Sequence, residues 1–331
     1  MTGIDGKRIL FCGLGTSAVA WYRCVLPAQA LGADWCGLGW QPPDLQFYTG
    51  LVKGATRLPR WEDYDLIVFQ QPRGHGWLKL IKDLQGKGIK VAFEIDDYVD
   101  AIGSMKDHDF RDAFRGEELA KLHMNMRQAD AILCSTEYIA HRYRLLNKRI
   151  FVCRNGLDLS RYKLTRPPRP TVNFLWAGGT GHVEAAVPWF QSLIPVMQER
   201  PDTCLVTIGQ NFAGGVGKHL DRAERCLAIP FTPIEQYPSA MTMGDIALAP
   251  AGHGGFHRGK SDLRFLEAGA LGMAVIADPV TYGTIEHGQT GVLAASPVEA
   301  QYWMAKLADD EELRVRLGEN AREYVTEERS M

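Results

Sequence analysis

The amino-acid sequence predicts an α/β protein with two doubly wound domains. Three observations predict it: short apolar runs alternate with helical patterns along the chain, the runs are apolar throughout rather than at every second residue, and a proline-rich segment divides them into two sets. Runs that are apolar throughout are typical of parallel strands buried on both faces of a sheet. The length of 331 residues agrees with two domains of ordinary size.

Strands and helices are expected in strict alternation, which predicts parallel sheets covered by helices on both faces. In the first half the predicted strands are 8–14, 35–40, 66–71, 90–95, 131–135 and 149–154, and the helices lie around 18–31, 76–86, 116–128 and 136–146. In the second half the predicted strands are 172–178, 204–209, 245–251 and 273–279, and the helices lie around 183–199, 260–271, 297–308 and 310–325.

The boundary between the halves is the segment 163–170, whose three prolines predict a semi-rigid linker rather than a helix or a central strand. It separates a first domain, residues 1–162, from a second domain, residues 171–331. Ligands of open α/β sheets bind at the carboxyl ends of the strands. Two such domains therefore predict a ligand cleft between them.

The composition excludes several classes of protein. With 46% hydrophobic residues, 23% charged residues and a net charge of -2, the sequence is that of an ordinary globular protein. It has no run of 18 apolar residues and no signal-peptide pattern, so we expect a cytoplasmic protein without integral membrane contact. The seven cysteines are scattered without a C-x-x-C pair, which predicts reduced thiols rather than a disulfide framework or a zinc site.

Basic residues are concentrated between positions 141 and 169. This segment has nine Arg or Lys residues and one acid, Asp158, for a local charge of +8. Such a surface can meet an anionic acceptor, a membrane face or nucleic acid. The alternative is a solvated helix face followed by a basic linker.

The first predicted strand leads into Gly13-Leu-Gly15-Thr-Ser-Ala18, which matches the G-x-G-x-x-A turn of dinucleotide-binding proteins. That class also needs an acid after the second strand, where it binds the ribose. The second strand ends at Trp40, and Asp34 precedes it. Gly15 therefore predicts a tight turn with close backbone approach to a ligand, and an NAD-dependent oxidoreductase is a less favoured alternative.

A glycine-rich loop follows the predicted strand 245–251 and leads into a helix expected to begin near Ser261. Free backbone N–H groups and the helix dipole make such a turn an anion site. Lys260 adds a positive charge there, as a diphosphate requires, and Glu267 lies further along the helix, placed for sugar hydroxyls. Taken singly, the two residues predict only a solvated lysine and an exposed helix residue.

The stretch 245–294 resembles the donor-nucleotide region of GT-B fold glycosyltransferases, and specifically the family 4-like retaining enzymes that bacteria and phages encode. With the similar stretches 129–162 and 177–190, the resemblance spans most of the chain. It implies two Rossmann-like domains that face each other across a cleft. It also implies a nucleotide diphosphate sugar, with UDP the expected nucleotide, bound to the second domain, and an acceptor that enters from the first.

The resemblance implies roles for single residues of the second domain. Lys260 and Ser261 would contact the diphosphate and Glu267 the ribose hydroxyls, while Tyr282 and Gly283 would border the donor. A turn under the donor phosphates corresponds to Gly178, Gly179, Thr180 and Gly181.

Catalysis in these enzymes rests on stabilising the leaving diphosphate. We expect Lys260, His182 and Asp96 to be the catalytic residues, with His182 at a helix start where a neutral imidazole can donate to phosphate. Transfer would retain the anomeric configuration, use no metal, and need no cofactor beyond the nucleotide sugar, which is a substrate. A buried histidine with ordinary partners is the alternative for His182.

Candidate acceptor-binding residues follow strands of the first domain. Asp96 and Asp97 come directly after strand 90–95, Arg73 and His75 follow strand 66–71, and Gly15 follows strand 8–14. Because the carboxyl ends of parallel strands meet at one edge, these residues are expected to face the cleft. A solvated turn in which Asp96 caps the next segment is the alternative for the acids.

Two departures from the family pattern stand out. Gly259 occupies the position of an acid that acts near the donor sugar in many members, so that role passes elsewhere or is absent. The helix that usually crosses back onto the first domain is expected to be short or missing. A catalytically silent protein that binds a sugar nucleotide or nucleic acid is therefore an alternative.

The sequence does not choose among several acceptors: a glycan, lipid-linked or free, a small molecule, a protein, or a hydroxylated DNA base. The basic segment mildly favours an anionic acceptor.

Overall fold

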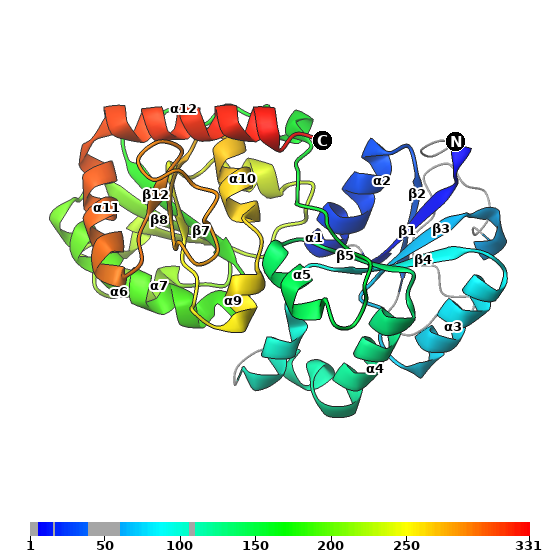
Figure 1. Cartoon of the computed structure of the whole chain (residues 1–331). Coiled ribbons are helices and arrows are strands. Elements are labelled where there is room, and N and C mark those ends of the chain that lie inside the picture. Colours follow the sequence, from blue (N-terminus) through cyan, green and yellow to red (C-terminus); the bar gives the residue numbers. More distant parts are fainter. Residues whose placement is uncertain (1–5, 16, 39–59, 106–109) are drawn as a thin grey trace.

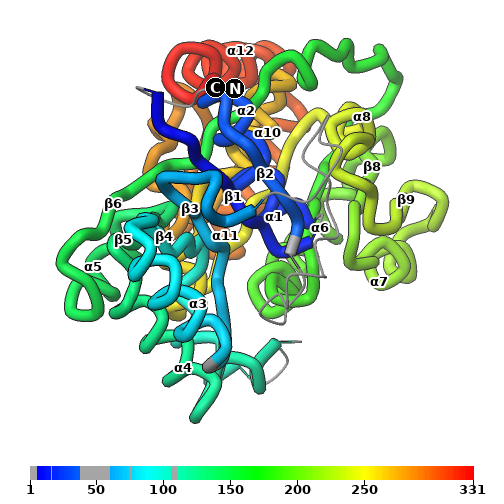
Figure 2. Tube along the Cα trace, turned by 90° about the vertical axis from the view of Figure 1, so that its right-hand side faces the viewer, coloured from blue at the N-terminus to red at the C-terminus, as the bar shows by residue number. Residues whose placement is uncertain are grey.

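Two parallel sheets of six strands each form the framework of the chain (Figure 1). The computed structural model describes residues 6–15, 17–38, 60–105 and 110–331. The strand order is β2-β1-β3-β4-β5-β6 in the first sheet, as Figure 2 shows from right to left, and β12-β11-β10-β7-β8-β9 in the second. The order reverses between β1 and β3 in one sheet and between β7 and β10 in the other, so both are doubly wound. This confirms the predicted fold class.

The first sheet contains every strand that the sequence predicts for it. Its strands are β1 (Ile9–Leu14), β2 (Asp34–Leu38), β3 (Leu66–Gln70), β4 (Lys90–Ile95), β5 (Ala131–Cys134) and β6 (Ile150–Val152). Its helices are α1 (Ala18–Ala20), the π-helix η2 (Trp21–Val25), α2 (Leu26–Ala30), α3 (His75–Gly86), α4 (Gly116–Gln128) and α5 (Glu137–Tyr143), with 3₁₀ turns η3 (Trp61–Asp63), η4 (Val99–Ser104), η5 (Arg111–Phe114) and η6 (Leu159–Tyr162). The end of the strand predicted at 35–40 lies outside the described residues.

The second sheet has two strands that the sequence analysis missed. Its strands are β7 (Val172–Gly178), β8 (Thr203–Gly209), β9 (Cys226–Ile229), β10 (Ile246–Ala249), β11 (Ala274–Ala277) and β12 (Val292–Leu293). Its helices are η7 (Thr180–His182), α6 (Val183–Glu199), α7 (Ala213–Gly217), η8 (Ala223–Arg225), α8 (Tyr237–Met241), α9 (Gly255–Gly259), α10 (Leu263–Ala270), α11 (Pro297–Asp309) and α12 (Glu311–Glu328). The missed strands β9 and β12 lie at the two edges of the sheet; β12 has only two residues, and β9 has four and is directly followed by Pro230.

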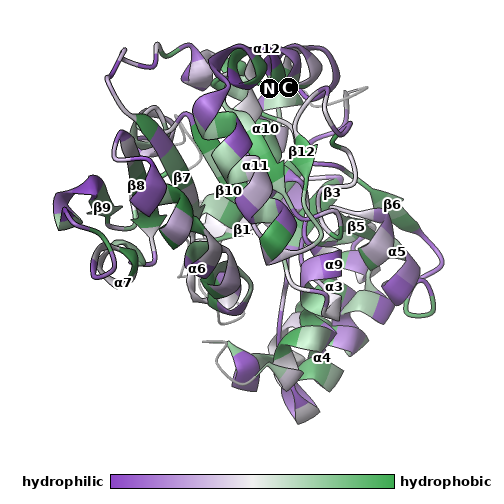
Figure 3. Cartoon of the chain, turned by 90° about the vertical axis from the view of Figure 1, so that its left-hand side faces the viewer, coloured by the Kyte–Doolittle hydropathy of each residue, from purple (hydrophilic) through white to green (hydrophobic). Residues whose placement is uncertain are grey.

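Helices cover both faces of the second sheet, as its apolar strands require. On one face α6 and α11 pack against Phe174, Trp176 and Leu248, and on the other α10 and α12 pack against Leu175 and Val275. Figure 3 shows the hydrophobic strands β7 and β8 at the centre of this domain.

The two domains exchange apolar side chains across their boundary. Tyr22 and Leu26 of the first domain belong to the hydrophobic cluster that contains α10 and α12, whereas Phe256 of α9 belongs to the cluster around Tyr98 in the first domain. Each domain therefore inserts part of its own surface into the core of the other, and these contacts fix the spacing of the residues that line the cleft.

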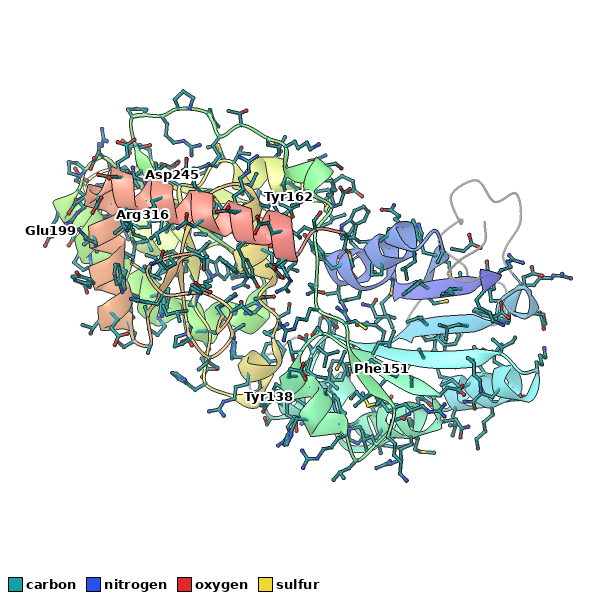
Figure 4. The ribbon with its side chains drawn as sticks, turned by 45° about the horizontal axis from the view of Figure 1, so that its top comes forward. Tyr138, Phe151, Tyr162, Glu199, Asp245 and Arg316 are labelled. Atoms are coloured by element: carbon teal, nitrogen blue, oxygen red, sulfur yellow. The ribbon has the colours of Figure 1, made fainter. Side chains whose placement is uncertain are left out.

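The second half of the predicted linker is attached to the second domain. Arg166 donates to Asp245 at 3.1 Å, and Arg169 donates to the backbone carbonyl of Met243. Asp245 lies at the end of that domain close to α12 (Figure 4).

The end of the chain returns from the second domain to the segment that leaves the first sheet. α12 packs on α10, and beyond it Ser330 pairs with Leu157 in a parallel bridge. The Leu157 amide donates to the Arg329 carbonyl at 2.8 Å, and the Met331 amide donates to the Leu157 carbonyl at 2.9 Å. Arg329, Ser330 and Met331, which follow the helix, thus contact the first domain at Leu157.

We expect Gly318→Ala to destabilise the protein, because a methyl group at 318 in α12 would overlap the carbonyl oxygen of Gly272 in the turn after α10. Overpacking of this kind costs about 1–3 kcal/mol of unfolding free energy. The matched control is Gly214→Ala in α7, where the new methyl meets nothing within 4 Å and helix propensity favours alanine. Urea unfolding measures both variants, and an unchanged midpoint for Gly318→Ala would mean that α12 does not pack this closely.

Candidate active site

A pocket of about 160 Å³ lies between the two domains and is named the cleft pocket here. It brings together residues from both domains: Ala18, Val19, Tyr22, Arg23, Asp96, Asp97, Asn155, His182, Lys260, Ser261, Leu263, Arg264 and Tyr282. Six of these are residues that the sequence analysis predicted for the site. The pocket sits beyond the carboxyl end of β4 and beside the turn after β7, where open α/β sheets bind ligands.

The first domain supplies a pair of carboxylates to this pocket. Asp96 and Asp97 follow β4, and Gln71 donates to Asp96 Oδ1 at 2.9 Å. Gln71 has φ +44°, a left-handed conformation that no other non-glycine residue adopts in the described part of the chain. Burial, followed by the charges of Asp97 and Glu94, raises the pKa of Asp96 to about 7. Asp96 is therefore a carboxylate held near its point of ionisation at neutral pH.

The second domain supplies two cations. Lys260 Nζ lies 2.8 Å from Asp97 Oδ1 and 2.9 Å from its Oδ2, and 4.3 Å above the ring of Phe256. Arg264 packs 5.7 Å from the Trp176 ring, and its Nη1 is buried without a hydrogen-bond partner. Arg264 was not among the residues predicted from the sequence, although it is a second cation only four residues after Lys260.

The helix expected to begin near Ser261 begins two residues later, at Leu263. The chain first forms the short helix α9, then passes Lys260 in an extended conformation, and α10 begins at Leu263 after the N-cap Asp262. Glycine-rich loops favour such breaks because they lack a preferred backbone conformation. Asp262 is bound by Arg329 at 2.8 and 2.9 Å, so an acidic side chain already lies at this helix terminus. Positive charge at the site comes from Lys260 and Arg264.

Glu267 is enclosed rather than open to the cleft pocket. It is 4% exposed, it accepts a hydrogen bond from Tyr22 of the first domain at 2.5 Å, and it accepts a longer one from Tyr237 at 3.4 Å. Burial raises its pKa to about 7, against the lowering effect of the Tyr22 hydrogen bond and of Arg264. A ribose at this carboxylate would have to take the place of the Tyr22 hydroxyl.

The remaining predicted donor residues surround these groups. Gly178 ends β7 directly beside Arg264, since a methyl group there would come 2.6 Å from Arg264 Nη2. Gly179 lies under the ring of Phe231, and Thr180 and Gly181 form the 3₁₀ turn that leads to His182. These four residues of the turn are not among the described residues that line the cleft pocket, whereas Tyr282 lines it and Gly283 lies on the far side of Lys260.

A second pocket of about 210 Å³, the first-domain pocket, opens at the ends of β1, β3 and β4. Its described lining residues are Leu14, Ser17, Val19, Gln70, Gln71, Arg73, Asp96, Asp97, Val99, Ile102, Phe110 and Phe114. Arg73 stacks 4.1 Å from the Phe114 ring, and burial lowers its pKa to about 10. Gly15 turns with φ +61° behind Gly37, and the backbone of His75 begins α3, while its side chain lies outside the described residues.

The basic segment 141–169 does not form one continuous surface. Arg142 donates to the Tyr98 hydroxyl at 2.6 Å and lies over that ring, and Arg161 lies over the Trp21 ring. The arginines of the linker bind the second domain, as described above. The segment therefore does not present one basic face to an anionic acceptor. It has exposed basic residues around the end of α5, and several of its other cations bind groups within the protein.

A buried hydrogen-bond network connects the domains behind the cleft. Arg23, in η2, donates to Glu94 at 2.6 Å and to Asn155 at 2.8 Å, and Asn155 donates to Ser261 at 2.8 Å. Arg329 continues the network from the Asn155 carbonyl, 3.0 Å from its Nε, to Asp262. The network sets the position of Ser261, and with it Lys260, relative to the strand end that carries Asp96.

Within the described ranges, no group of three or more His, Cys, Asp or Glu side chains is placed to hold a metal ion. None of the helices formed by the described residues is both long and apolar enough to cross a membrane.

No protein-family profile and no curated protein matches the sequence, whereas many solved structures match the fold. Anabaena Alr3699/HepE, solved in complex with UDP and glucose, is similar over 98% of this chain and 95% of its own, with a TM-score of 0.63 and 13% identity. A glycosyltransferase from Rickettsia africae is similar over 98% of this chain and 94% of its own, with a TM-score of 0.63 and 12% identity. The chain has the GT-B fold.

Larger proteins share this GT-B fold over part of their length. TarM is similar over 80% of this chain, with a TM-score of 0.58 and 14% identity. The present chain spans about half, 52%, of TarM. The predicted GT-B architecture is thus confirmed.

Because of Asp96 in this GT-B cleft, the unfolding free energy of the protein is expected to fall as the pH rises from about 4 to about 7. The unfolded chain ionises Asp96 near pH 4, whereas the folded protein holds this proton up to about pH 7, so the unfolded state binds fewer protons in between. Asp96→Asn removes this cost and should raise the thermal midpoint more at pH 8 than at pH 5. Asp83→Asn, at an exposed position of α3, is the control, and equal shifts for Asp96→Asn at both pH values would contradict the raised pKa.

Proposed function

We propose that this chain is a glycosyltransferase that moves a sugar from a UDP-linked donor to an acceptor hydroxyl, with retention at the anomeric carbon and without a metal ion. The observation that carries the proposal is the cleft pocket, where Lys260 and Arg264 of one domain face Asp96 and Asp97 of the other. The likeness to HepE, which was solved with UDP and glucose, supports the choice of donor.

The diphosphate is assigned to Lys260 and Arg264. In the free protein Lys260 is 24% exposed and its charge is balanced by Asp97. An arriving diphosphate carries more negative charge than one carboxylate, and Arg264 has an unpaired N–H to offer it. Gly178, where β7 ends, lies beside Arg264, and the turn after it leads to His182, which lines the cleft pocket.

The ribose is assigned to Glu267 next to this diphosphate site. A ribose hydroxyl can donate to this carboxylate as the Tyr22 hydroxyl does in the free protein, so the exchange preserves the hydrogen bond that a buried carboxylate requires. Glu267 and Arg264 lie on the first turns of the same helix, α10, which orients the nucleoside and the diphosphate together.

Chemistry in this site depends on charge that develops on the leaving diphosphate. As the bond from the anomeric carbon to UDP breaks, negative charge grows on the phosphate oxygen, and fixed cations beside that oxygen stabilise it most at that stage. His182 at the start of α6 lines the same pocket and can donate to phosphate. Asp96 lies on the opposite side, where an acceptor hydroxyl can bind it.

Lys260→Ala is expected to lower kcat more than it raises the donor KM, because the contact strengthens as the diphosphate leaves. Loss of one such contact costs about 2.7–4 kcal/mol of barrier, or about 100- to 1,000-fold in rate. Release of UDP from UDP-glucose or UDP-N-acetylglucosamine measures it, with and without acceptor.

The matched control is Lys148→Ala, which removes an exposed lysine of the first domain and should leave both constants unchanged. Full turnover by Lys260→Ala would refute the diphosphate assignment. Binding of UDP by the wild type without any release from UDP-sugars would make the chain a nucleotide-binding protein rather than an enzyme.

A further inference from the structure

The first-domain pocket and the cleft pocket share a wall. Val19, Asp96 and Asp97 line both of them. A molecule in the first-domain pocket therefore reaches the same two carboxylates that face the cations of the second domain. The chemistry of the first-domain pocket decides which acceptors can place a hydroxyl at this wall.

The lining of the first-domain pocket is part polar and part apolar, and the two parts meet where Arg73 lies over the Phe114 ring. The polar part is supplied by the ends of β3 and β4, with Gln70, Gln71, Arg73, Asp96 and Asp97, and the apolar part by η4, η5 and the residue before η5, with Val99, Ile102, Phe110 and Phe114. Leu14 and Val19 add apolar surface from β1 and α1. A ligand that fills this space must have one polar edge and one apolar edge, because hydroxyls buried against the apolar side would lose their hydrogen bonds.

The charges that line the first-domain pocket are balanced. Arg73 donates to Gln71 at 3.1 Å, and Gln71 in turn donates to Asp96, which connects the cation to the carboxylate. The second carboxylate, Asp97, is paired with Lys260. An anionic ligand would meet the carboxylates of Asp96 and Asp97 and a cationic ligand would meet Arg73, so the pocket favours an uncharged one.

The volume of the pocket limits the ligand to about one ring. Pockets for drug-sized ligands measure about 300–1,000 Å³, and the first-domain pocket has about 210 Å³. The aromatic rings of Phe110 and Phe114 offer flat apolar contacts of the kind on which a planar ring stacks.

We infer that the acceptor of the proposed transfer is an uncharged planar ring that carries a hydroxyl or hydroxymethyl group on one edge. The ring lies against Phe110, Val99 and Ile102, and its hydroxyl binds Asp96. This inference rests on the proposed function and adds the class of acceptor. Two sources can supply such a ring: a small aryl alcohol, or a hydroxymethylated base in a single-stranded nucleic acid.

The transfer step balances with these groups. The acceptor oxygen forms a bond to the anomeric carbon on the same face from which the UDP oxygen leaves, so that the configuration is retained, and the bond from that carbon to the UDP oxygen breaks with its electron pair on the diphosphate. The proton of the acceptor hydroxyl passes to the Asp96 carboxylate, which Gln71 orients through Oδ1. No oxidant, reductant or further reactant is required.

The test measures binding of benzyl alcohol, glucose and glycerol 3-phosphate to the full chain with UDP present, by saturation-transfer NMR, and then UDP release from UDP-glucose and UDP-N-acetylglucosamine with each of them. Benzyl alcohol is expected to bind and to accelerate UDP release, whereas glucose and glycerol 3-phosphate are not. Preference for glucose or glycerol 3-phosphate would overturn the inference.

Two phenylalanines provide a matched pair of variants. Phe110 lines the pocket and is 49% exposed, and Phe151 on the edge strand of the same sheet is 54% exposed, so neither change removes a core residue (Figure 4). Phe110→Ala should weaken benzyl alcohol binding about tenfold, and Phe151→Ala should leave it unchanged. Equal behaviour of the two variants would place the ring elsewhere and overturn the inference.

Two further arms separate the sources and the hypotheses. Free 5-hydroxymethyl-2′-deoxycytidine is compared with a single-stranded oligonucleotide that contains the same base: tighter, salt-sensitive binding of the oligonucleotide assigns the acceptor to nucleic acid, and equal binding assigns it to small molecules. UDP affinity is measured by calorimetry on the same samples. UDP binding without ring binding overturns this inference alone, whereas absence of UDP binding overturns the proposed function.

Discussion

The buried ion pair between Arg23 and Glu94 is the interaction on which the arrangement of the two domains depends. Their side chains are 5% and 1% exposed, and the charged nitrogen and oxygen lie 2.6 Å apart. A charge buried to this extent must be paired, because an uncompensated one would cost several kcal/mol. Arg23 Nη1 donates to Asn155 and to the Cys153 carbonyl, so the pair also fixes the segment where the chain leaves the first sheet.

From that segment the network continues into the second domain. Asn155 holds Ser261, and Arg329 holds Asp262, so both residues before α10 are fixed to the domain boundary. The segment after α12 is therefore hydrogen-bonded to Asn155, which lines the cleft pocket, and to Asp262, which follows the lining residue Ser261. This connection also explains why two domains with separate sheets share one hydrophobic cluster.

Because the two domains are in contact, two residues of the second domain that are proposed to bind the donor are already paired with side chains of the first domain. Lys260 is held by Asp97, and Glu267 by Tyr22. Under the proposed function a donor replaces two first-domain partners with a diphosphate and a ribose. Its binding free energy then equals the difference between these contacts, which favours ligands that satisfy both positions at once.

The fold could be predicted from the sequence because strands and helices produce local hydrophobic patterns. The contacts of the site could not, because they join residues that are far apart in the sequence. Apolar runs identified ten of the twelve strands in the described residues, and the two that were missed, β9 and β12, are the edge strands of the second sheet. The positions of Asp96 and Lys260 at a cleft followed from their places after a strand and in a glycine-rich loop, whereas Tyr282 was expected there from the resemblance to GT-B glycosyltransferases. The enclosure of Glu267 by Tyr22, 245 residues away, depends on how the domains meet and leaves no local signal.

The same limit applies to the break before α10. Glycines at 254, 255 and 259 allowed both a continuous helix and a kink, and contacts of Gly259 with Tyr98 of the other domain decide between them. A methyl group at 259 would come 2.8 Å from Tyr98 Cβ, so this position has no room for the acid that its relatives are expected to carry. The carboxylate of Asp97, which precedes Tyr98, reaches the neighbouring Lys260.

Hydrogen–deuterium exchange with and without UDP tests the central claim, that a nucleotide diphosphate binds between the domains on Lys260 and Arg264, most directly. Binding there should slow exchange of the amides at 178–183 and 259–267, and of those around Tyr22, while α11 on the far face of the second sheet stays unchanged. Slower exchange confined to the first domain, or no change at 259–267 at a UDP concentration that saturates the protein, would contradict the account.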